Sequence, residues 1–493
     1  MLIKKLVFLV MISVLGGGAP APAEPPASQP ATPPESRGPI IVKLTLHPVA
    51  IAQPALRFRL LPPISETRPG NAAMQYMMAA QFLPPDPESN SPSDPWNRLD
   101  QQLEMTPEAF SPAEADRALA LFIPRRWVDM GARRERADWD IDFRAEGINT
   151  ILPHLNHMRA LANVVALRAR VAAVRGDFRE AEHQMQNDFS MARQLNTQDF
   201  LVQDLVSVGI ARLILDQGVE NWIAQKDAPN LYWALSNLPQ RFIDLNAGGS
   251  MEEAALRFTD PLFAKALDGK LPPDQWTQLL KAAIRLQRSE RDPTASATPA
   301  EIEADLKHFR DAHAAEAKQY LRSTGTPQDQ INAMSVDQAI GRYFAAQYIT
   351  MSDELWKAWP LPYAQSAPIL IRTEQEVARE KENGNPLLDI LSLSLDRARY
   401  TMADLDRHIA IARVIEALRD YAAHHAGQPP ERLDQITAVP VPNDPVMAKP
   451  FEYRADGNSA VIDAPAPQEE TSPQGGLHLS PPRGSEYQLT FVK

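Results

Sequence analysis

The chain has 493 residues, a formal net charge of −12 and no cysteine. The lack of cysteine excludes disulfides, thiolate metal sites and cysteine nucleophiles. The acidic balance disfavours a nucleic-acid groove or a polybasic membrane patch, because both need clustered Lys and Arg. With 44% apolar and 23% charged residues, the composition is that of an ordinary globular protein.

The N-terminus, residues 1–23, has the pattern of a signal peptide. Two lysines precede an apolar stretch, residues 6–15, that is too short to span a bilayer. Residues 21–23 fit the small-x-small cleavage pattern, which makes Glu24 the first mature residue. We therefore expect an exported protein, periplasmic or extracellular; the alternative is an uncleaved anchor. The Pro- and Ala-rich residues 24–39 are predicted to form a flexible linker.

Residues 40–390 are predicted to form a helical body with short strands at its start. Alternating apolar residues over 40–46 and 55–61 indicate two strands or extended segments. Asn71 is expected to cap the first helix. Capping-box patterns then mark further helix starts at Ser111, Ser250, Thr298 and Ser335.

The strongest helical pattern spans residues 150–195. Thr150 is expected to cap the first helix, Gly176 to end it and Asp177 to cap the next. The short turn between two amphipathic helices predicts antiparallel packing. A third helix over 197–224 is apolar over a wide arc, so it should be the most buried element.

Residues 391–493 are predicted to form a long helix followed by a small β module. The helix extends over 395–424, and Asp456-Gly457 is a strong hairpin signal. Residues 487–492 alternate enough to add a strand. The predicted fold class is therefore mainly α: an irregular antiparallel helical array with short β elements near both ends.

The turn Gly176 to Ala181 resembles the inter-helix turn of a tetratricopeptide repeat, in which Gly makes the turn and Ala permits close helix approach. No second copy follows at a 34-residue period. The resemblance therefore implies one tetratricopeptide-like hairpin inside a larger helical body.

The segment over 408–463 resembles the C-terminal module of pseudopilins, with Leu418-Arg419-Asp420-Tyr421, Asn443-Asp444-Pro445 and Lys449-Pro450-Phe451-Glu452-Tyr453. Pseudopilins carry this module directly after an N-terminal membrane helix, whereas here it lies far along the chain, so pilus assembly is not implied. The whole chain also resembles a group of uncharacterised exported bacterial proteins, through residues 56–62, 69–73 and 231–235. That resemblance implies no activity.

Histidines supply the first candidates for chemistry. His154 and His157 share a helix face and could hold a metal, but a zinc site needs a third ligand and none is spaced to help. His313, with Glu316 three residues on, could act as a general base, although a hydrogen-bonded interface histidine is the commoner case. His424 and His425 suit the C-terminal end of a helix dipole.

Two further segments have alternative interpretations. Asp138, Asp140 and Asp142 imitate the first half of a calcium loop, but the Gly and Glu that such a loop requires are absent; a short strand with one wet face also fits. The aromatic group at Trp356, Trp359 and Tyr363 could line a ligand groove or cover the helical core.

No nucleophile elbow, phosphate-binding loop or dinucleotide fingerprint occurs in the sequence. No catalytic residue is singled out, and no cofactor or metal is expected. We predict a non-catalytic exported envelope protein acting as a protein-binding scaffold, whose partner would be an envelope or secretion protein. The alternative is a carboxylate-dependent hydrolase of an envelope polymer.

Overall fold

The computed structural model describes residues 38–492 apart from 86–93, 124, 148–149, 198–199, 244–256, 259, 292–296, 392–394 and 468–481. The predicted signal peptide, nearly all of the linker and the capping box at Ser250 lie outside the described residues.

The protein is mainly α-helical, as predicted. The first half contains α2 (Ala72–Ala80), α3 (Pro95–Glu104), α4 (Pro112–Leu119), α5 (Arg125–Ala132), α6 (Phe143–Glu146), α7 (His154–Val174), α8 (Phe178–Leu195), α9 (Leu201–Ile214), the π-helical η3 (Leu215–Glu220), α10 (Asn221–Ile223) and α11 (Tyr232–Ser236). The second half contains α13 (Pro261–Leu267), α14 (Trp276–Arg291), α15 (Pro299–Ser323), α16 (Gln328–Ala333), α17 (Val336–Ala358), α18 (Tyr363–Glu382) and α19 (Leu395–His424). Short 3-10 turns are η1 (Ile64–Glu66), η4 (Pro273–Gln275), η5 (Pro386–Leu391) and η6 (Leu433–Gln435).

Local capping explains many of these helix starts. The side chains of Asn71, Asp177 and Ser335 accept hydrogen bonds from backbone N–H groups in the first turns of α2, α8 and α17. Thr298 and Glu301 form a full capping box at the start of α15. These four predicted caps are confirmed.

Three sequence expectations were wrong. The helix α4 begins directly after Ser111 as predicted, but the capping box is wrong, because the Ser111 side chain makes no cap bond. Thr150 does not cap α7, because its hydroxyl donates to the Gly147 carbonyl and the helix begins four residues later. Of the two alternatives for residues 55–61, the strand is wrong: residues 55–56 form a turn and bends follow, and the Arg59 N–H donates to the side chain of Glu182 where a strand would need a backbone partner.

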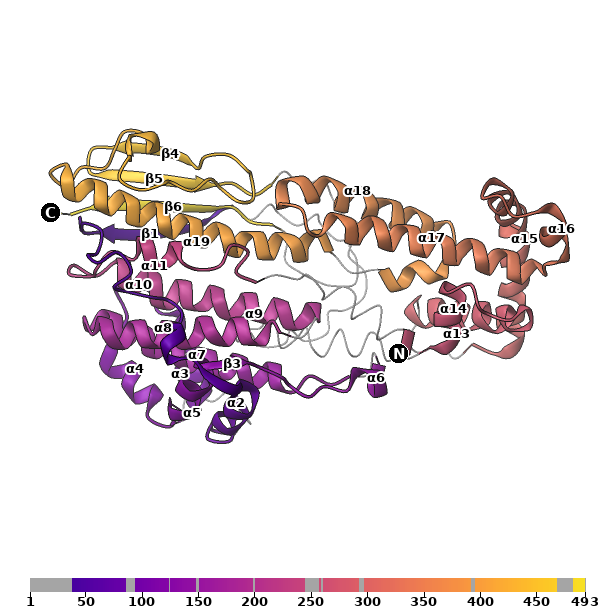
Figure 1. The fold of residues 1–493 in the computed structure, drawn as a ribbon, viewed down its shortest axis with the longest axis horizontal. Helices are drawn as coiled ribbons and strands as arrows, with labels where there is room; N and C mark the ends of the chain where they lie inside the picture. The colour runs from indigo at the N-terminus through magenta and orange to yellow at the C-terminus, as the bar shows by residue number, and fades with distance from the viewer. Residues whose placement is uncertain are drawn as a thin grey trace, which may run out of the picture.

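The first and last strands lie side by side in one four-stranded sheet with the order β1-β6-β5-β4 (Figure 1). Its strands are β1 (Ile40–Leu46), β4 (Glu452–Asp456), β5 (Ser459–Ala464) and β6 (Ser485–Phe491). β1 pairs with β6 in parallel, and the other neighbours are antiparallel. β2 (Arg68–Asn71) and β3 (Arg134–Arg136) form a separate parallel pair.

Two main hydrophobic cores divide the molecule. The larger joins α7, α8, α9, α11 and α19 to the inner face of the four-stranded sheet, and the smaller joins α13, α14, α15 and α17. α17 contributes to both, since Leu355 belongs to the larger core and Phe344 to the smaller. α18 does the same through Leu370 and Val377. These two long helices therefore connect the cores.

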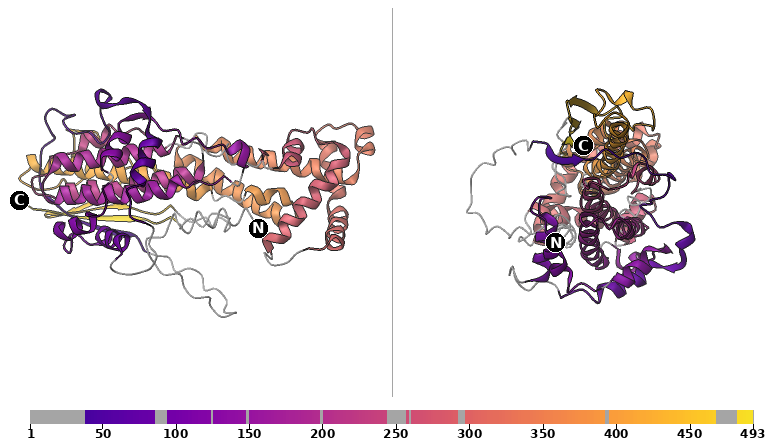
Figure 2. Two further views of the ribbon diagram at one scale, coloured as in Figure 1. Left: turned by 90° about the horizontal axis from the view of Figure 1, so that it is seen from below. Right: turned by 90° about the vertical axis from the view of Figure 1, so that its left-hand side faces the viewer.

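The molecule is elongated, with the sheet near one end and α15 and α16 near the other (Figures 1 and 2). α7, α8, α9 and α19 extend along the long axis (Figure 1). No helix in the described part of the chain combines the length and apolarity that a membrane crossing needs.

Candidate functional site

The first of the two α7 histidines, His154, is placed for packing. The His154 ring stacks on Trp139 with ring centroids 4.5 Å apart, and its Nε2 lies 3.3 Å from Oε1 of Gln203. Burial lowers the pKa of His154 to about 4, so the imidazole is neutral at physiological pH. Within the described residues no three His, Asp or Glu side chains gather as a metal site would require. His154 therefore belongs to the core around α7, whereas His157 is only half-buried and its Nδ1 has no hydrogen-bond partner among the described residues.

The Asp138–Asp142 segment is not a strand. Its backbone is irregular, and the carbonyl of Asp138 accepts a 2.7 Å bond from the amide of Asn71. Asn71 Oδ1 in turn accepts from the N–H of Asp138 at 2.8 Å. These two bonds hold the segment against the start of α2, and Trp139 within it stacks on His154 of α7.

His313 lies inside the smaller core. It packs against Phe309 and Phe344, with Nδ1 3.9 Å from Oε2 of Glu316. Burial outweighs the nearby Glu316 and lowers the pKa of His313. Its Nε2 also lies against the Gly384 backbone, where an added Cβ would approach to 2.9 Å. This histidine fills an interhelical contact.

The remaining sequence candidates also have structural roles. Nδ1 of His424 lies 2.8 Å from the Asp420 carbonyl, and His425 stacks on Tyr421 at 3.7 Å. The ring centroids of Trp356 and Trp359 lie 5.5 Å apart, and both residues pack in the larger core. Tyr363 packs on Tyr400.

A histidine that the sequence analysis missed joins α8 to α5. His183 Nε2 lies 3.0 Å from Oδ1 of Asp129, and its Nδ1 lies 2.9 Å from Nη2 of Arg133. Because the guanidinium can only donate, Nδ1 accepts and Nε2–H donates. Both ring nitrogens are therefore hydrogen-bonded within the protein.

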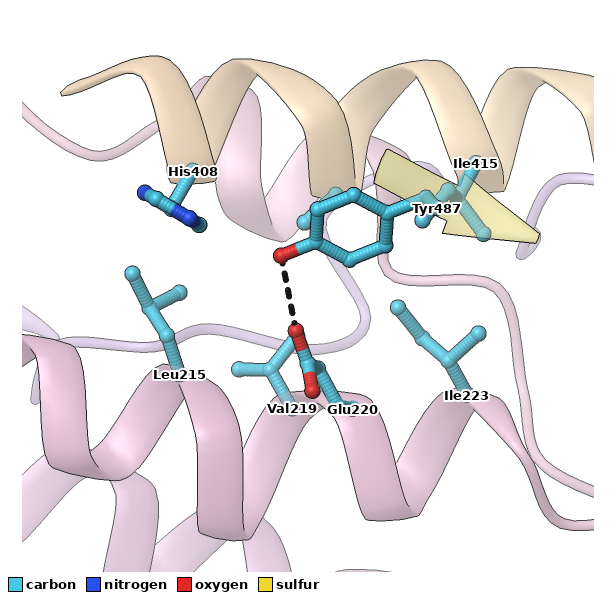
Figure 3. A pocket seen from close by; sticks show the side chains of 8 residues that line it. Leu215, Val219, Glu220, Ile223, His408, Ile415 and Tyr487 are labelled. Atoms are coloured by element: carbon cyan, nitrogen blue, oxygen red, sulfur yellow. Dashed lines mark hydrogen bonds between the residues drawn. The ribbon is translucent and has the colours of Figure 1, made fainter. Parts of the chain in front are cut away.

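The most unusual polar group lies where η3 meets α19 and β6 (Figure 3). Tyr487 of β6 donates a 3.0 Å hydrogen bond to Oε1 of Glu220. Figure 3 shows His408 of α19 at the same small cavity, which apolar side chains of η3, α10 and α19 otherwise line. The cavity is about 10 Å³, near the lower limit for one water molecule.

Local helix geometry directs Glu220 into this cavity. The wider π-helical turn shifts the register of the residues after α9. Gly218 lies against α8, since an added Cβ would be 2.9 Å from Cγ of Met185. The close approach of η3 to α8 leaves the opposite face, with Glu220, toward α19 and β6.

Charges surround this carboxyl group on two sides. Arg212 Nε, two turns before Glu220, lies 2.9 Å from Oδ1 of Asp216. On α19, His408 Nδ1 lies 3.3 Å from Oδ2 of Asp404. The stripe Arg212, Asp216, Glu220 at steps of four was a visible signal in an otherwise apolar helix, but its partners on α19 and β6 were not.

Burial sets the protonation of the group. Glu220 keeps some solvent exposure as a residue, but protein atoms densely surround its carboxyl group. Burial, followed by the charge of Asp216, raises the pKa of Glu220 to about 8. Burial and Glu220 likewise raise the pKa of Tyr487 far above its usual value. At neutral pH the carboxyl group of Glu220 is therefore protonated. The cavity beside it has no room for a substrate.

An open groove lies elsewhere, between α7 and α9. Its volume is about 180 Å³. Its lining is mostly apolar and comprises Arg159, Ala162, Asn163, Leu205, Val206, Gly209, Ile210 and Leu213. Small-molecule pockets usually measure about 300–1,000 Å³, so this groove suits a side chain of another protein better than a whole substrate.

Comparisons with known proteins give no relative for this arrangement. No protein-family model, no curated protein and no solved structure matches the chain.

Proposed function

We propose that the protein is a non-catalytic, exported envelope protein that acts as a protein-binding scaffold, with the α7–α9 groove as its binding site. The groove is the observation that carries the proposal, because it opens to solvent, has an apolar floor and is bounded by helices. Helical grooves of this kind accept helical or extended segments of a partner.

The surroundings of Glu220 support this choice over the hydrolase. An acid catalyst often has a raised pKa, as Glu220 has. However, its cavity has room for about one water molecule and none for a polymer chain. Replacement of Glu220 with Gln would abolish activity if the hydrolase alternative were right, and should leave scaffold binding unchanged.

Cross-linking in intact cells tests the scaffold. The protein is tagged at its C-terminus, cross-linked, and its adducts are identified by mass spectrometry, for the native chain and for Gly209→Trp, which fills the groove. We expect a defined protein adduct, another protein or an untagged copy, that is lost in Gly209→Trp. An adduct pattern that Gly209→Trp does not change would contradict the proposal.

Export is tested separately. Fractionation should recover the protein outside the cytoplasm, with Glu24 as the N-terminal residue if residues 1–23 are a cleaved signal. A full-length N-terminus on a membrane-attached protein would instead indicate the uncleaved anchor.

A further inference from the structure

The helix α2 is apolar on its exposed side as well as on its buried side. None of its nine residues is charged, and Ala72, Tyr76 and Ala79 pack in the larger core. Met74, on the other side of the helix, is 64% exposed and belongs to none of the described hydrophobic cores. Ile64, on the η1 turn that leads into β2, is 92% exposed. Apolar side chains as exposed as these two are stabilised when another surface removes them from water.

Arginines gather beside these side chains on the β2–β3 pair. Arg68 of β2 lies directly opposite Arg134 of β3, and Arg136 follows on the same face of the strand. Glu135, between the two β3 arginines, belongs to the opposite face. Arg68 is exposed and forms no ion pair within the described residues, whereas Arg136 lies 4.0 Å from Asp138 with both side chains largely exposed. Because like charges in opposite positions destabilise a sheet, this group of arginines is not explained by the stability of the fold.

The part of the chain around these arginines is positive, although the whole chain is acidic. Residues 57–82 and 125–137, which we call the basic region, contain eight arginines and three acidic residues, a net charge of +5 in a chain of −12. Two of the arginines pair with carboxylates, at 2.6 and 3.1 Å. Figure 1 shows that α2 and β3 of this region lie next to each other at one margin of the molecule. The sequence argument against a polybasic patch used the overall charge and therefore missed this local excess.

We propose that the basic region docks on the surface of an anionic lipid bilayer. Arginines attract the negatively charged head groups, and exposed apolar side chains enter the boundary between head groups and acyl chains. A free anion such as phosphate would use the arginines alone and leave Ile64 and Met74 in water. The combination of both kinds of side chain therefore favours a lipid surface. The contact is peripheral and needs no membrane-crossing helix.

Vesicle co-sedimentation of the mature chain, residues 24–493, tests the inference. The vesicles are pure phosphatidylcholine, or phosphatidylcholine with about 30% of the anionic lipid phosphatidylglycerol. We expect binding to the anionic vesicles at about 0.1 M salt, little binding to the neutral ones, and release from the anionic vesicles at about 1 M salt.

Two double variants separate the charged contact from the apolar one. Arg68→Glu with Arg136→Glu should lower the vesicle partition coefficient at least about tenfold, because each arginine near an anionic surface is worth a factor of about five. Ile64→Ser with Met74→Ser should lower it at least about threefold, because less apolar surface then leaves water on binding.

Matched control variants lie outside the basic region. Arg372→Glu with Arg379→Glu makes the same change of charge at exposed positions of α18, and Ile349→Ser replaces an exposed apolar side chain of α17. Both controls should bind the vesicles as the native chain does. Circular dichroism and thermal unfolding confirm that each variant is folded.

A native chain that binds no anionic vesicle would overturn the inference. So would an equal loss of binding in the α18 variant, since the vesicles would then respond to total charge alone. A loss from the arginine variant with none from the apolar variant would mean attraction to any polyanion, which contradicts docking on lipid. None of these outcomes bears on the α7–α9 groove, which contains none of the substituted residues.

Discussion

The hydroxyl of Tyr487, on the last strand, lies 3.0 Å from Oε1 of Glu220, on the π-helical turn after α9. β6 also pairs with β1, so this one bond connects the terminal sheet to the central helices. The connection is buried, because Tyr487 is 2% exposed. Its loss should therefore be measurable in stability.

Tyr487→Phe removes the donor and leaves the shape of the ring. An unsatisfied buried polar group costs about 1–3 kcal/mol, so the free energy of unfolding should fall by that amount near pH 7. Urea unfolding followed by circular dichroism measures it. Tyr453→Phe is the control, since Tyr453 donates to the Pro430 carbonyl in a partly exposed place. If both variants lost the same unfolding free energy, the hydrogen bond to Glu220 would contribute no more than an ordinary, partly exposed one.

Stability should fall as the pH rises through the range in which Glu220 titrates. The pKa of Glu220 is about 8 in the folded state and 4.5 in the unfolded state. The folded state therefore binds the proton more tightly, and its stabilising effect is complete below pH 4.5 and lost as the pH rises toward 8. For each pH unit between these two pKa values, the free energy of unfolding should fall by at most about 1.4 kcal/mol.

Glu220→Gln tests this dependence, because glutamine cannot ionise. The difference in unfolding free energy between the variant and the native chain should grow in favour of the variant from pH 5 to about pH 8. Arg212, Asp216, Asp404, His408 and Tyr487 surround the site and are unchanged, so the difference isolates Glu220. A flat difference curve would mean that the carboxyl group is ionised throughout.

The buried ion pair of Arg407 and Asp444 should attach the C-terminal module to α19. Nε and Nη2 of Arg407 lie 2.9 and 2.8 Å from the two oxygens of Asp444, and both residues are almost fully buried. Asp444→Asn should cost about 3–5 kcal/mol, because it removes the carboxylate that accepts both hydrogen bonds and leaves the buried guanidinium only the more distant Asp404, 4.0 Å away. Asp434→Asn, at the exposed pair with Arg432, should cost less than about 1 kcal/mol.

The helices could be predicted because their signals are local. Asp177 and Ser335 cap helices within three residues of themselves, and the 395–424 helix has the predicted bounds. The terminal strands could also be predicted, but not their pairing. Alternation in a strand indicates which face is buried and carries no information about which strand lies beside it. The β1–β6 pair therefore emerged only from the three-dimensional structure.

The polar cluster around Glu220 shows the same limit. The helical stripe that contains it is visible in the sequence, whereas Tyr487 and His408 are ordinary residues of a strand and a helix far along the chain. Gly218, in the π-helical turn that contains Glu220, lies against Met185 of α8, a contact that no local pattern encodes. The histidines chosen from the sequence were conspicuous by type; His154, His313 and His425 pack against neighbouring rings, whereas the side chain of His424 is largely exposed.

Asp188 of α8 offers the last test. It is fully buried, and neither carboxylate oxygen has a hydrogen-bond partner among the described residues. Burial raises the pKa of Asp188 well above its usual value, so protonation stabilises the fold and this stabilisation is lost as the pH rises above 3.8.

Asp188→Asn should therefore match the native chain at pH 4 and exceed it at pH 8 by about 1–3 kcal/mol, the usual cost of an unsatisfied buried group. Thermal and urea unfolding at both pH values measure the difference. Asp116→Asn, at an exposed pair with Arg175, should change stability by less than about 1 kcal/mol at either pH. If Asp188→Asn were instead less stable at pH 8, the carboxylate would be ionised and bound to a group that favours its charge.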